Sequence, residues 1–176
     1  MDTAYLCGGC FWCTESVFSA MKGVQLAESG YIGGTDPAPT YRAVCEGETG
    51  HAEGVRVVFD PSVLPFEKVL KAFFATHDPT TLNRQGNDVG TQYRSAIFYA
   101  SEAQRATAAA VMAELAPTYS APLVTELTLG PPAHAWHRAE DYHQSYFEKN
   151  PGNGYCRAMI PSKLHKLQAK FPEALK

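Results

Sequence analysis

The order of strand-like and helix-like segments constrains the fold of this chain more than any other feature. Runs rich in β-branched and apolar residues predict strands at residues 4–6, 24–31, 52–59 and 93–99. Apolar side chains at helical spacing predict helices at residues 10–21 and 65–74. The order strand, helix, strand, strand, helix, strand is typical of a split βαβ arrangement. We therefore predict an α+β fold, a two-layer α/β sandwich with a ferredoxin-like split βαβ core.

The pattern continues less clearly after this core. It predicts a helix at residues 101–117 and a strand at residues 123–129. Two more helices are predicted at residues 140–149 and 161–171. The glycine-rich run at residues 150–154 separates them and is expected to be mobile, because glycine restricts the backbone least.

A single domain is predicted over residues 1–176, because a domain typically has about 150 residues. We place its core at about residues 3–130 and a loop-rich C-terminal tail at residues 131–176. Two long loops rich in polar residues, 35–50 and 77–92, are the expected positions of functional side chains.

The composition excludes several classes of protein. The 15 lysine and arginine residues against 18 acidic ones give a net charge of −3, too balanced for a nucleic-acid-binding or polybasic membrane protein. No apolar run approaches the ~20 residues of a membrane span, and the first residues lack a signal-peptide pattern. We therefore expect a soluble, cytoplasmic monomer with neither a nucleic-acid nor a membrane partner.

Cysteine usage points to chemistry at sulfur. The chain has five cysteines, at positions 7, 10, 13, 45 and 156. An odd number, with three crowded near the start, is unlike an extracellular disulfide framework. Such crowding in a reducing compartment is typical of metal binding or thiol redox chemistry.

The first three cysteines lie at a glycine turn between a predicted strand and a predicted helix. Cys10 follows Gly8 and Gly9, where unpaired backbone N–H groups and the helix dipole favour a thiolate. We therefore expect the pKa of Cys10 to fall below the ~8.5 of a free thiol and Cys10 to be the nucleophile. Cys7, on the strand, is expected to be packed.

This turn has three possible interpretations: buried hydrophobic cysteines, a metal or iron–sulfur site, and thiol redox chemistry. Three clustered cysteines are unusual for plain packing. A bacterial ferredoxin run would need a fourth cysteine where Val17 stands, and Phe11 and Trp12 are poor neighbours for a cluster. The histidines at 134, 137 and 143 do not have a usual zinc spacing and are expected to be solvated or capping residues. Redox chemistry fits best, and no metal is expected.

A series of motifs then resembles one family. The run Gly9-Cys10-Phe11-Trp12 is similar to the active-site signature of the peptide methionine sulfoxide reductase A family, which reduces the S-epimer. The other matching motifs follow in order: Gly30-Tyr31, Gly33-Gly34, Pro39-Thr40-Tyr41, Thr49-Gly50-His51-Ala52-Glu53, His77-Asp78-Pro79, Arg84-Gln85-Gly86-Asn87-Asp88, Gly90-Thr91-Gln92-Tyr93-Arg94-Ser95, Ala139-Glu140-Asp141-Tyr142-His143-Gln144, Asn150-Pro151 and Gly154-Tyr155-Cys156. They cover nearly the whole chain.

The resemblance implies thiol-dependent reduction of methionine-S-sulfoxide, protein-bound or free, to methionine. It implies that Cys10 attacks the sulfur while Glu53 acts as the acid and Tyr41 and Tyr93 donate hydrogen bonds. Spacing alone does not choose Glu53 over the neighbouring glutamates. Asp88 is implied to help order water and the acid.

The same resemblance implies the rest of the site. Phe11 and Trp12 would receive the S-methyl group, with Tyr155 as a further substrate-binding residue. A sulfenic acid on Cys10 would be resolved to a disulfide, and Cys156 is our first choice of resolving thiol.

The alternative resolving thiol is Cys13, where many relatives carry glycine. A bond from Cys10 to Cys13 would join positions three apart in a helix and distort it. Cys45 is expected to be buried and inert, and no cysteine follows Cys156. Thioredoxin, or dithiothreitol in vitro, would reduce the disulfide, so no cofactor is expected.

Two other functions remain open from the residues. A thioredoxin-like dithiol oxidoreductase would use Cys10-Phe11-Trp12-Cys13 and leave Glu53 idle. A non-catalytic iron–sulfur or zinc module would use the cysteines as ligands only.

Overall fold

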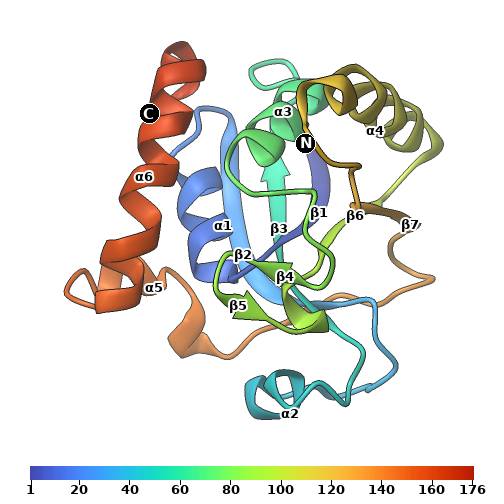
Figure 1. Ribbon diagram of the computed structural model, residues 1–176, viewed down its shortest axis with the longest axis vertical. Coiled ribbons are helices and arrows are strands. Elements are labelled where there is room, and N and C mark those ends of the chain that lie inside the picture. The colour runs from blue at the N-terminus through green and yellow to red at the C-terminus, as the bar shows by residue number, and fades with distance from the viewer.

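In the computed structural model, which describes all 176 residues, helices pack around a central six-stranded sheet (Figure 1). The strands of the sheet are β1 (Asp2–Gly8), β2 (Val24–Ile32), β3 (Ala52–Phe59), β6 (Ser95–Tyr99), β7 (Glu126–Leu129) and β8 (His137–Arg138). A separate hairpin consists of β4 (Arg84–Gln85) and β5 (Asp88–Val89). The helices are α1 (Phe11–Ser19), α2 (Tyr41–Cys45), α3 (Phe66–Ala75), α4 (Glu102–Leu115), α5 (Tyr146–Lys149) and α6 (Gly154–Lys170). None of them is long and apolar enough to cross a lipid bilayer.

The strand order confirms the predicted fold. It runs β7-β6-β1-β3-β2-β8, and the four central strands pair antiparallel. With α1 between β1 and β2, and α3 between β3 and β6, this is the split βαβ topology of a ferredoxin-like sandwich. β7 adds a parallel strand at one edge, and β8 adds an antiparallel strand at the other.

The core fills the layer between the sheet and the helices. Leu6 and Val57 on the sheet, Phe18 on α1 and Leu70 and Phe73 on α3 are all at most 1% exposed. The helix residues in this set, Phe18, Leu70 and Phe73, belong to the apolar positions that gave the two helices their 3.6-residue period. Burying them fixes which face of each helix packs on the sheet.

Antiparallel pairing brings the ends of two strands and the starts of two others to the same end of the sheet. Gly8, the last residue of β1, pairs with Ser95, and Tyr31 near the end of β2 pairs with Glu53 near the start of β3. In Figure 1, α2 and the β4–β5 hairpin lie at this end of the molecule. Both come from the two loops in which functional side chains were expected.

Those two loops contain more regular structure than predicted. Residues 35–50 contain α2, and residues 77–92 contain β4 and β5. Each element is five residues or fewer, so no period could be read from the sequence.

The prediction for the C-terminal helices was wrong in its boundaries. The helix predicted from residue 161 begins at Gly154, because the Asn153 side chain accepts a hydrogen bond from the Cys156 N–H at 3.0 Å and caps it. Pro161 lies inside this 17-residue helix. The helix predicted at 140–149 is only the four-residue α5, preceded by a 3₁₀ turn at Asp141–His143.

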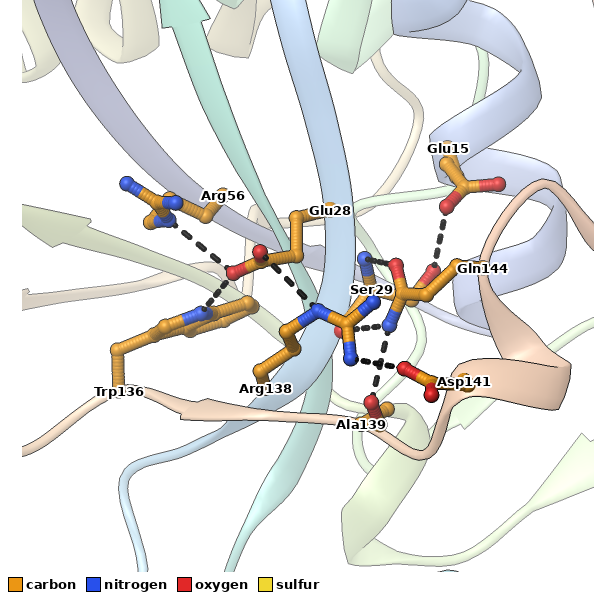
Figure 2. A network of polar contacts seen from close by, with 9 residues as sticks. All are labelled: Glu15, Glu28, Ser29, Arg56, Trp136, Arg138, Ala139, Asp141 and Gln144. Carbon is orange, nitrogen blue, oxygen red and sulfur yellow. Dashed lines mark hydrogen bonds and ion pairs between the residues drawn. The ribbon is translucent and has the colours of Figure 1, made fainter.

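Polar contacts hold the segment at residues 136–144 against β2 (Figure 2). The Gln144 side chain accepts from the Ser29 N–H at 2.9 Å and donates to the Ser29 carbonyl at 2.9 Å. The preceding residue of β2, Glu28, accepts from the Trp136 indole at 2.8 Å and pairs with Arg138 at 3.4 Å. Because these contacts lie on both sides of residues 140–143, they also fix that stretch, which faces the site described next.

Candidate active site

The candidate active site forms where β1 gives way to α1, beside the start of β3. Gly8 and Gly9 let the chain turn here: Gly9 has φ +96°, and a Cβ on it would lie 2.6 Å from the Gln85 side chain. Glu53 is oriented toward this turn, and its Oε1 accepts the Phe11 N–H at 3.1 Å. The acid and the cysteine turn are 42 residues apart in sequence and in contact in the fold.

Glu53 is a buried carboxyl group. It is 1% exposed, and its Oε2 has no hydrogen-bond partner. Burial raises its pKa to about 8, and the nearby Asp88 charge adds to the effect. Glu53 therefore carries a proton at neutral pH and can deliver it to an atom bound beside Cys10.

Cys10 is the N-cap of α1, with φ −58° and ψ 124°. Its thiol hydrogen-bonds to the Cys13 thiol, and this bond, burial and the charge of Glu53 raise the pKa of Cys10. The expectation of a lowered pKa was wrong, because the helix N-terminus is outweighed by these three effects. The same hydrogen bond lowers the pKa of Cys13, helped by the charge of Lys163.

Cys13 and Cys156 lie together in a small apolar cluster. They are 3% and 0% exposed and pack with Ile160, while Cys10 borders the cluster. From its glycine neighbours, Cys156 was expected to lie on a mobile connection. Instead it lies in the first turn of α6. Burial raises its pKa to about 11.

Two tyrosines reach the site from the long loops. Tyr41 begins α2, and its ring stacks with Phe11 at 6.2 Å between centroids. Tyr93 lies in the 3₁₀ turn before β6. Burial and the charge of Glu53 raise the pKa of both hydroxyls, so each keeps its proton.

Cys45, at the end of α2, is exposed. The expectation that it is buried was wrong, because the short helix presents it to solvent.

Aromatic side chains form one wall of the site. Phe11 is 1% exposed beneath it. Trp12 is half-buried and stacks on Tyr146 with centroids 3.8 Å apart and planes 6° from parallel. The edge of Tyr155 meets Trp12 at 6.3 Å. The predicted substrate-binding residues Phe11, Trp12 and Tyr155 therefore come together.

Asp88 reaches the site through Tyr155. The Tyr155 hydroxyl donates a hydrogen bond to Asp88 Oδ2, which ties the β4–β5 hairpin to α6. Burial is the main cause that raises the pKa of Tyr155, so its hydroxyl stays neutral.

Comparisons with known proteins identify the family of this chain. The chain matches a family described as peptide methionine sulfoxide reductase over residues 2–175. The chain belongs to the peptide methionine sulfoxide reductase family. The predicted resemblance is confirmed, and the reductase is an enzyme of methionine sulfoxide reduction.

Individual relatives match the reductase over nearly its whole length. A protein named peptide methionine sulfoxide reductase MsrA from Psychrobacter sp. is 54% identical and covers 98% of both chains. The MsrA of Deinococcus radiodurans is 51% identical, covering 99% of this chain and 84% of its own.

Solved structures of relatives have the same fold. Methionine sulfoxide reductase A of Corynebacterium diphtheriae superposes with a TM-score of 0.82 at 40% identity, over 86% of this chain and 76% of its own. Reduced Mxr1 from Saccharomyces cerevisiae has a TM-score of 0.78 at 33% identity, over 86% and 87%.

The sequence analysis missed two residues of the site in the reductase. His143 is 0% exposed rather than solvated, and its Nδ1 accepts the Trp12 indole N–H at 2.9 Å. Glu140 accepts from the Tyr31 hydroxyl at 2.7 Å and the Tyr41 N–H at 2.9 Å. Both belong to a matching motif, which was the only signal that could have identified them.

His143 is a neutral ring. Burial lowers its pKa, and its Nδ1 accepts a hydrogen bond, so the proton lies on Nε2. Nε2 is buried and has no partner. The ring lies 4.9 Å from Phe11 and 4.3 Å from Tyr41, which places it directly behind the aromatic wall.

Cys7 lies apart from the other two N-terminal cysteines. Cys7 packs with Ile32 and Phe98 in a separate cluster, as expected of a strand cysteine. Burial raises its pKa to about 12. Nowhere do three or more His, Cys, Asp or Glu side chains come together as a metal site would require.

Proposed function

We propose that the reductase reduces methionine-S-sulfoxide, protein-bound or free, through attack of Cys10 on the sulfoxide sulfur with Glu53 as the acid. One observation carries this proposal. A buried, protonated carboxyl is held at the Cys10 turn by the Phe11 N–H, and its second oxygen has no partner. Such an oxygen can protonate a ligand oxygen, because no protein atom competes for it.

The step leaves a sulfenic acid on Cys10 and releases methionine. The Cys10 sulfur bonds to the sulfoxide sulfur as the sulfoxide oxygen takes a proton from Glu53. That oxygen then transfers to Cys10 as the S–S bond breaks, and the thiol proton restores Glu53. Sulfur of methionine is reduced by two electrons, and Cys10 is oxidised by two.

Tyr41 and Tyr93 donate hydrogen bonds to the sulfoxide oxygen in this proposal. Their raised pKa values support the role, because a neutral hydroxyl is a donor. Phe11, Trp12 and Tyr155 surround the methyl group, and Asp88 fixes Tyr155.

Resolution of the sulfenic acid involves Cys13 and Cys156. Cys10 packs against the cluster of Cys13 and Cys156, and the Cys10 and Cys13 thiols are close enough to shift each other's pKa. Cys10 is the N-cap of α1 and has an extended ψ. A Cys10–Cys13 disulfide therefore distorts the helix less than a disulfide between two positions inside a helix would. These contacts favour Cys13 as the first partner and Cys156, its neighbour, as the next, the reverse of the order expected from sequence.

Thioredoxin is the proposed reductant of the final disulfide, with dithiothreitol as its substitute in vitro. Mxr1, the yeast relative, has been solved in complex with Trx2, which supports a protein dithiol in this role. The electrons come from thiols, so the proposal needs no bound cofactor. The monomeric state and the cytoplasmic location stay predictions.

A disulfide map after one turnover tests the proposal. Reduced protein is mixed with one equivalent of N-acetyl-methionine-S-sulfoxide and analysed by mass spectrometry. We expect one methionine formed, two thiols lost, and a bond that includes Cys13. Cys10→Ser should form no methionine, and normal formation would contradict the nucleophile.

Two variants separate the resolving thiols. Cys156→Ser should release one methionine, stop at a Cys10–Cys13 bond and fail to turn over with thioredoxin. Cys13→Ser should retain sulfenic acid on Cys10. A Cys10–Cys156 bond formed at the wild-type rate in Cys13→Ser would return the resolving role to Cys156.

The alternative function is a general dithiol oxidoreductase that uses Cys10 and Cys13. The Glu53→Gln variant distinguishes it from the proposed function, because only methionine sulfoxide reduction requires the acid. Insulin reduction that is unaffected by Glu53→Gln, without methionine formation, would favour that alternative.

A further inference from the structure

A lysine-lined groove opens beside the thiols and is not used by the proposed chemistry. It has a volume of about 660 Å³, and three side chains of α6, Lys163, Lys166 and Lys170, line it. In Figure 1, α6 runs from the end where α5 lies toward the end where α3 and α4 lie. The groove therefore leads away from the site along the molecule.

One end of the groove lies at the cysteine turn. Its lining includes Gln85, which contacts Gly9, and Met159, which packs on the Cys13 and Cys156 cluster. The charge of Lys163 acts on both Cys10 and Cys13. A polypeptide with its oxidised methionine beside Cys10 can continue into this groove.

The charges of the groove are unpaired. The only lysines in ion pairs are Lys68 and Lys71, on α3. α6 carries four basic residues and no acidic one, although the whole chain has a net charge of −3. A stretch of unpaired positive charge on an acidic protein is expected to attract a negative partner.

The one acidic side chain in the lining offsets only one of the three lysine charges of the groove. Asp78 is the carboxylate in the lining, and it accepts from the Thr80 N–H at 2.9 Å and the Thr80 hydroxyl at 2.6 Å. Lys163 donates to the Thr76 carbonyl at 2.6 Å, which fixes its ammonium group and leaves it two further donors.

We propose that this groove binds an acidic segment of the oxidised polypeptide, so that the reductase prefers methionine sulfoxides with nearby Glu or Asp residues. The inference rests on the proposed function and adds a sequence preference to it. Lys163 and Lys170 are seven positions apart, which is ~10 Å along a helix. An extended peptide spans that distance in about three residues. Acidic residues three apart therefore match the lysines.

Two peptides test the preference. Each contains one methionine-S-sulfoxide and blocked ends, with Glu in one peptide and Gln in the other at the third and sixth positions on both sides. At low salt we expect kcat/KM to be about threefold to tenfold higher for the Glu peptide, mainly through KM, because each ion pair in a solvated groove contributes weakly. The ratio should approach one near 1 M salt, where the Debye length is ~3 Å.

A charge-matched pair of variants locates the effect. Lys166→Gln/Lys170→Gln should remove most of the Glu-over-Gln preference. Lys22→Gln/Lys176→Gln should keep it, because these residues are also exposed and unpaired but do not line the groove.

Equal kcat/KM for the two peptides in the wild type would overturn the proposal. So would an equal loss of preference in both double variants. A third contrary result would be a rise in the KM for thioredoxin as the only effect of Lys166→Gln/Lys170→Gln. Reduction of both peptides at equal rates would leave the reductase function intact. Reduction of neither would contradict the proposed function instead.

Discussion

The ferredoxin-like core of the reductase is stabilised by different interactions from those that attach its C-terminal segment, residues 136–144. In the core, β1, β3 and β2 pair along their lengths and bury side chains such as Val55 and Val57 completely. The segment at residues 136–144 is attached mainly by hydrogen bonds of Gln144 and Glu28. Ala139 is the one buried apolar residue of this segment, and larger apolar side chains are buried again only in α6, at Ile160 and Leu167.

The two regions supply different groups to the site. The core fixes Cys10 and Glu53, the groups proposed to react with the sulfoxide. The segment at residues 136–144 contributes His143 to the aromatic wall, while α6 contributes Tyr155 to this wall and Cys156 to the thiol cluster. Few buried apolar contacts mean a low free energy of local opening, so we expect the segment to open without the core. Such opening would give a reductant access to the disulfide.

The largest expected effect comes from a change in the core alone. Glu53→Gln keeps the shape of the side chain and its contact to Phe11 but removes the acid. We expect kcat/KM to fall about 100- to 1000-fold, within the range of general acid catalysis. Wild-type activity should decline as pH rises through about 8, where Glu53 loses its proton, and the variant should lack this limb. A decrease of less than tenfold would remove Glu53 from the role of acid.

The second effect should appear in the C-terminal segment alone. Gln144→Ala removes the bonds to Ser29 N–H, Ser29 carbonyl and Ala139 carbonyl. At about 1 kcal/mol each, the free energy of local opening should fall by about 2–3 kcal/mol. Native-state hydrogen exchange should speed up at residues 136–150 and not in β1 or β3.

Asp141→Asn provides the control for that experiment. It lies in the same segment, but its side chain is 91% exposed and pairs only with Arg138, so the change should be below about 0.5 kcal/mol. Equal acceleration in β1 and β3 by Gln144→Ala would show a single cooperative unit and break the comparison.

The same division explains how much the sequence could predict. Strands and helices of the core have periods of 2 and 3.6 because one face of each is buried, so their order led directly to the fold. The Cys10 turn was readable because Gly8 and Gly9 mark the end of a strand. The raised pKa of Cys10 was not, because it depends on the contacts with Cys13 and Glu53.

The C-terminal segment has no such period. Its position depends on side-chain hydrogen bonds between residues about 110 apart, such as Trp136 to Glu28. These leave no repeating pattern in a sequence. His143 therefore resembled any surface histidine, and the start of α6 was hidden by Pro161, which is more often found in the first turn of a helix.

The third prediction concerns the contact that joins the two regions. His143→Phe removes the acceptor of the Trp12 indole N–H and leaves that donor without a partner, at a cost of about 1–2 kcal/mol. As a positioning residue, His143 should act through Trp12, so KM for N-acetyl-methionine-S-sulfoxide should rise about fivefold to twentyfold with a smaller change in kcat. His143→Gln, which retains an acceptor, should recover part of the loss. An unchanged KM in His143→Phe would mean that Trp12 holds its orientation through Tyr146 alone.

The last prediction concerns the core alone: the free energy of unfolding should change only gradually with pH, because of Glu53. Glu53 has a pKa of about 8 in the folded protein and about 4.3 in the unfolded chain, so between these values the folded state holds the extra proton. Its contribution to stability is complete below about pH 4.3 and is lost as pH rises toward 8, by at most ~1.4 kcal/mol per pH unit. The difference in unfolding free energy between wild type and Glu53→Gln, from urea titrations at pH 5.5, 6.5 and 7.5, should therefore shrink or change sign with rising pH. Parallel curves would mean that Glu53 titrates normally and that the core does not hold it protonated.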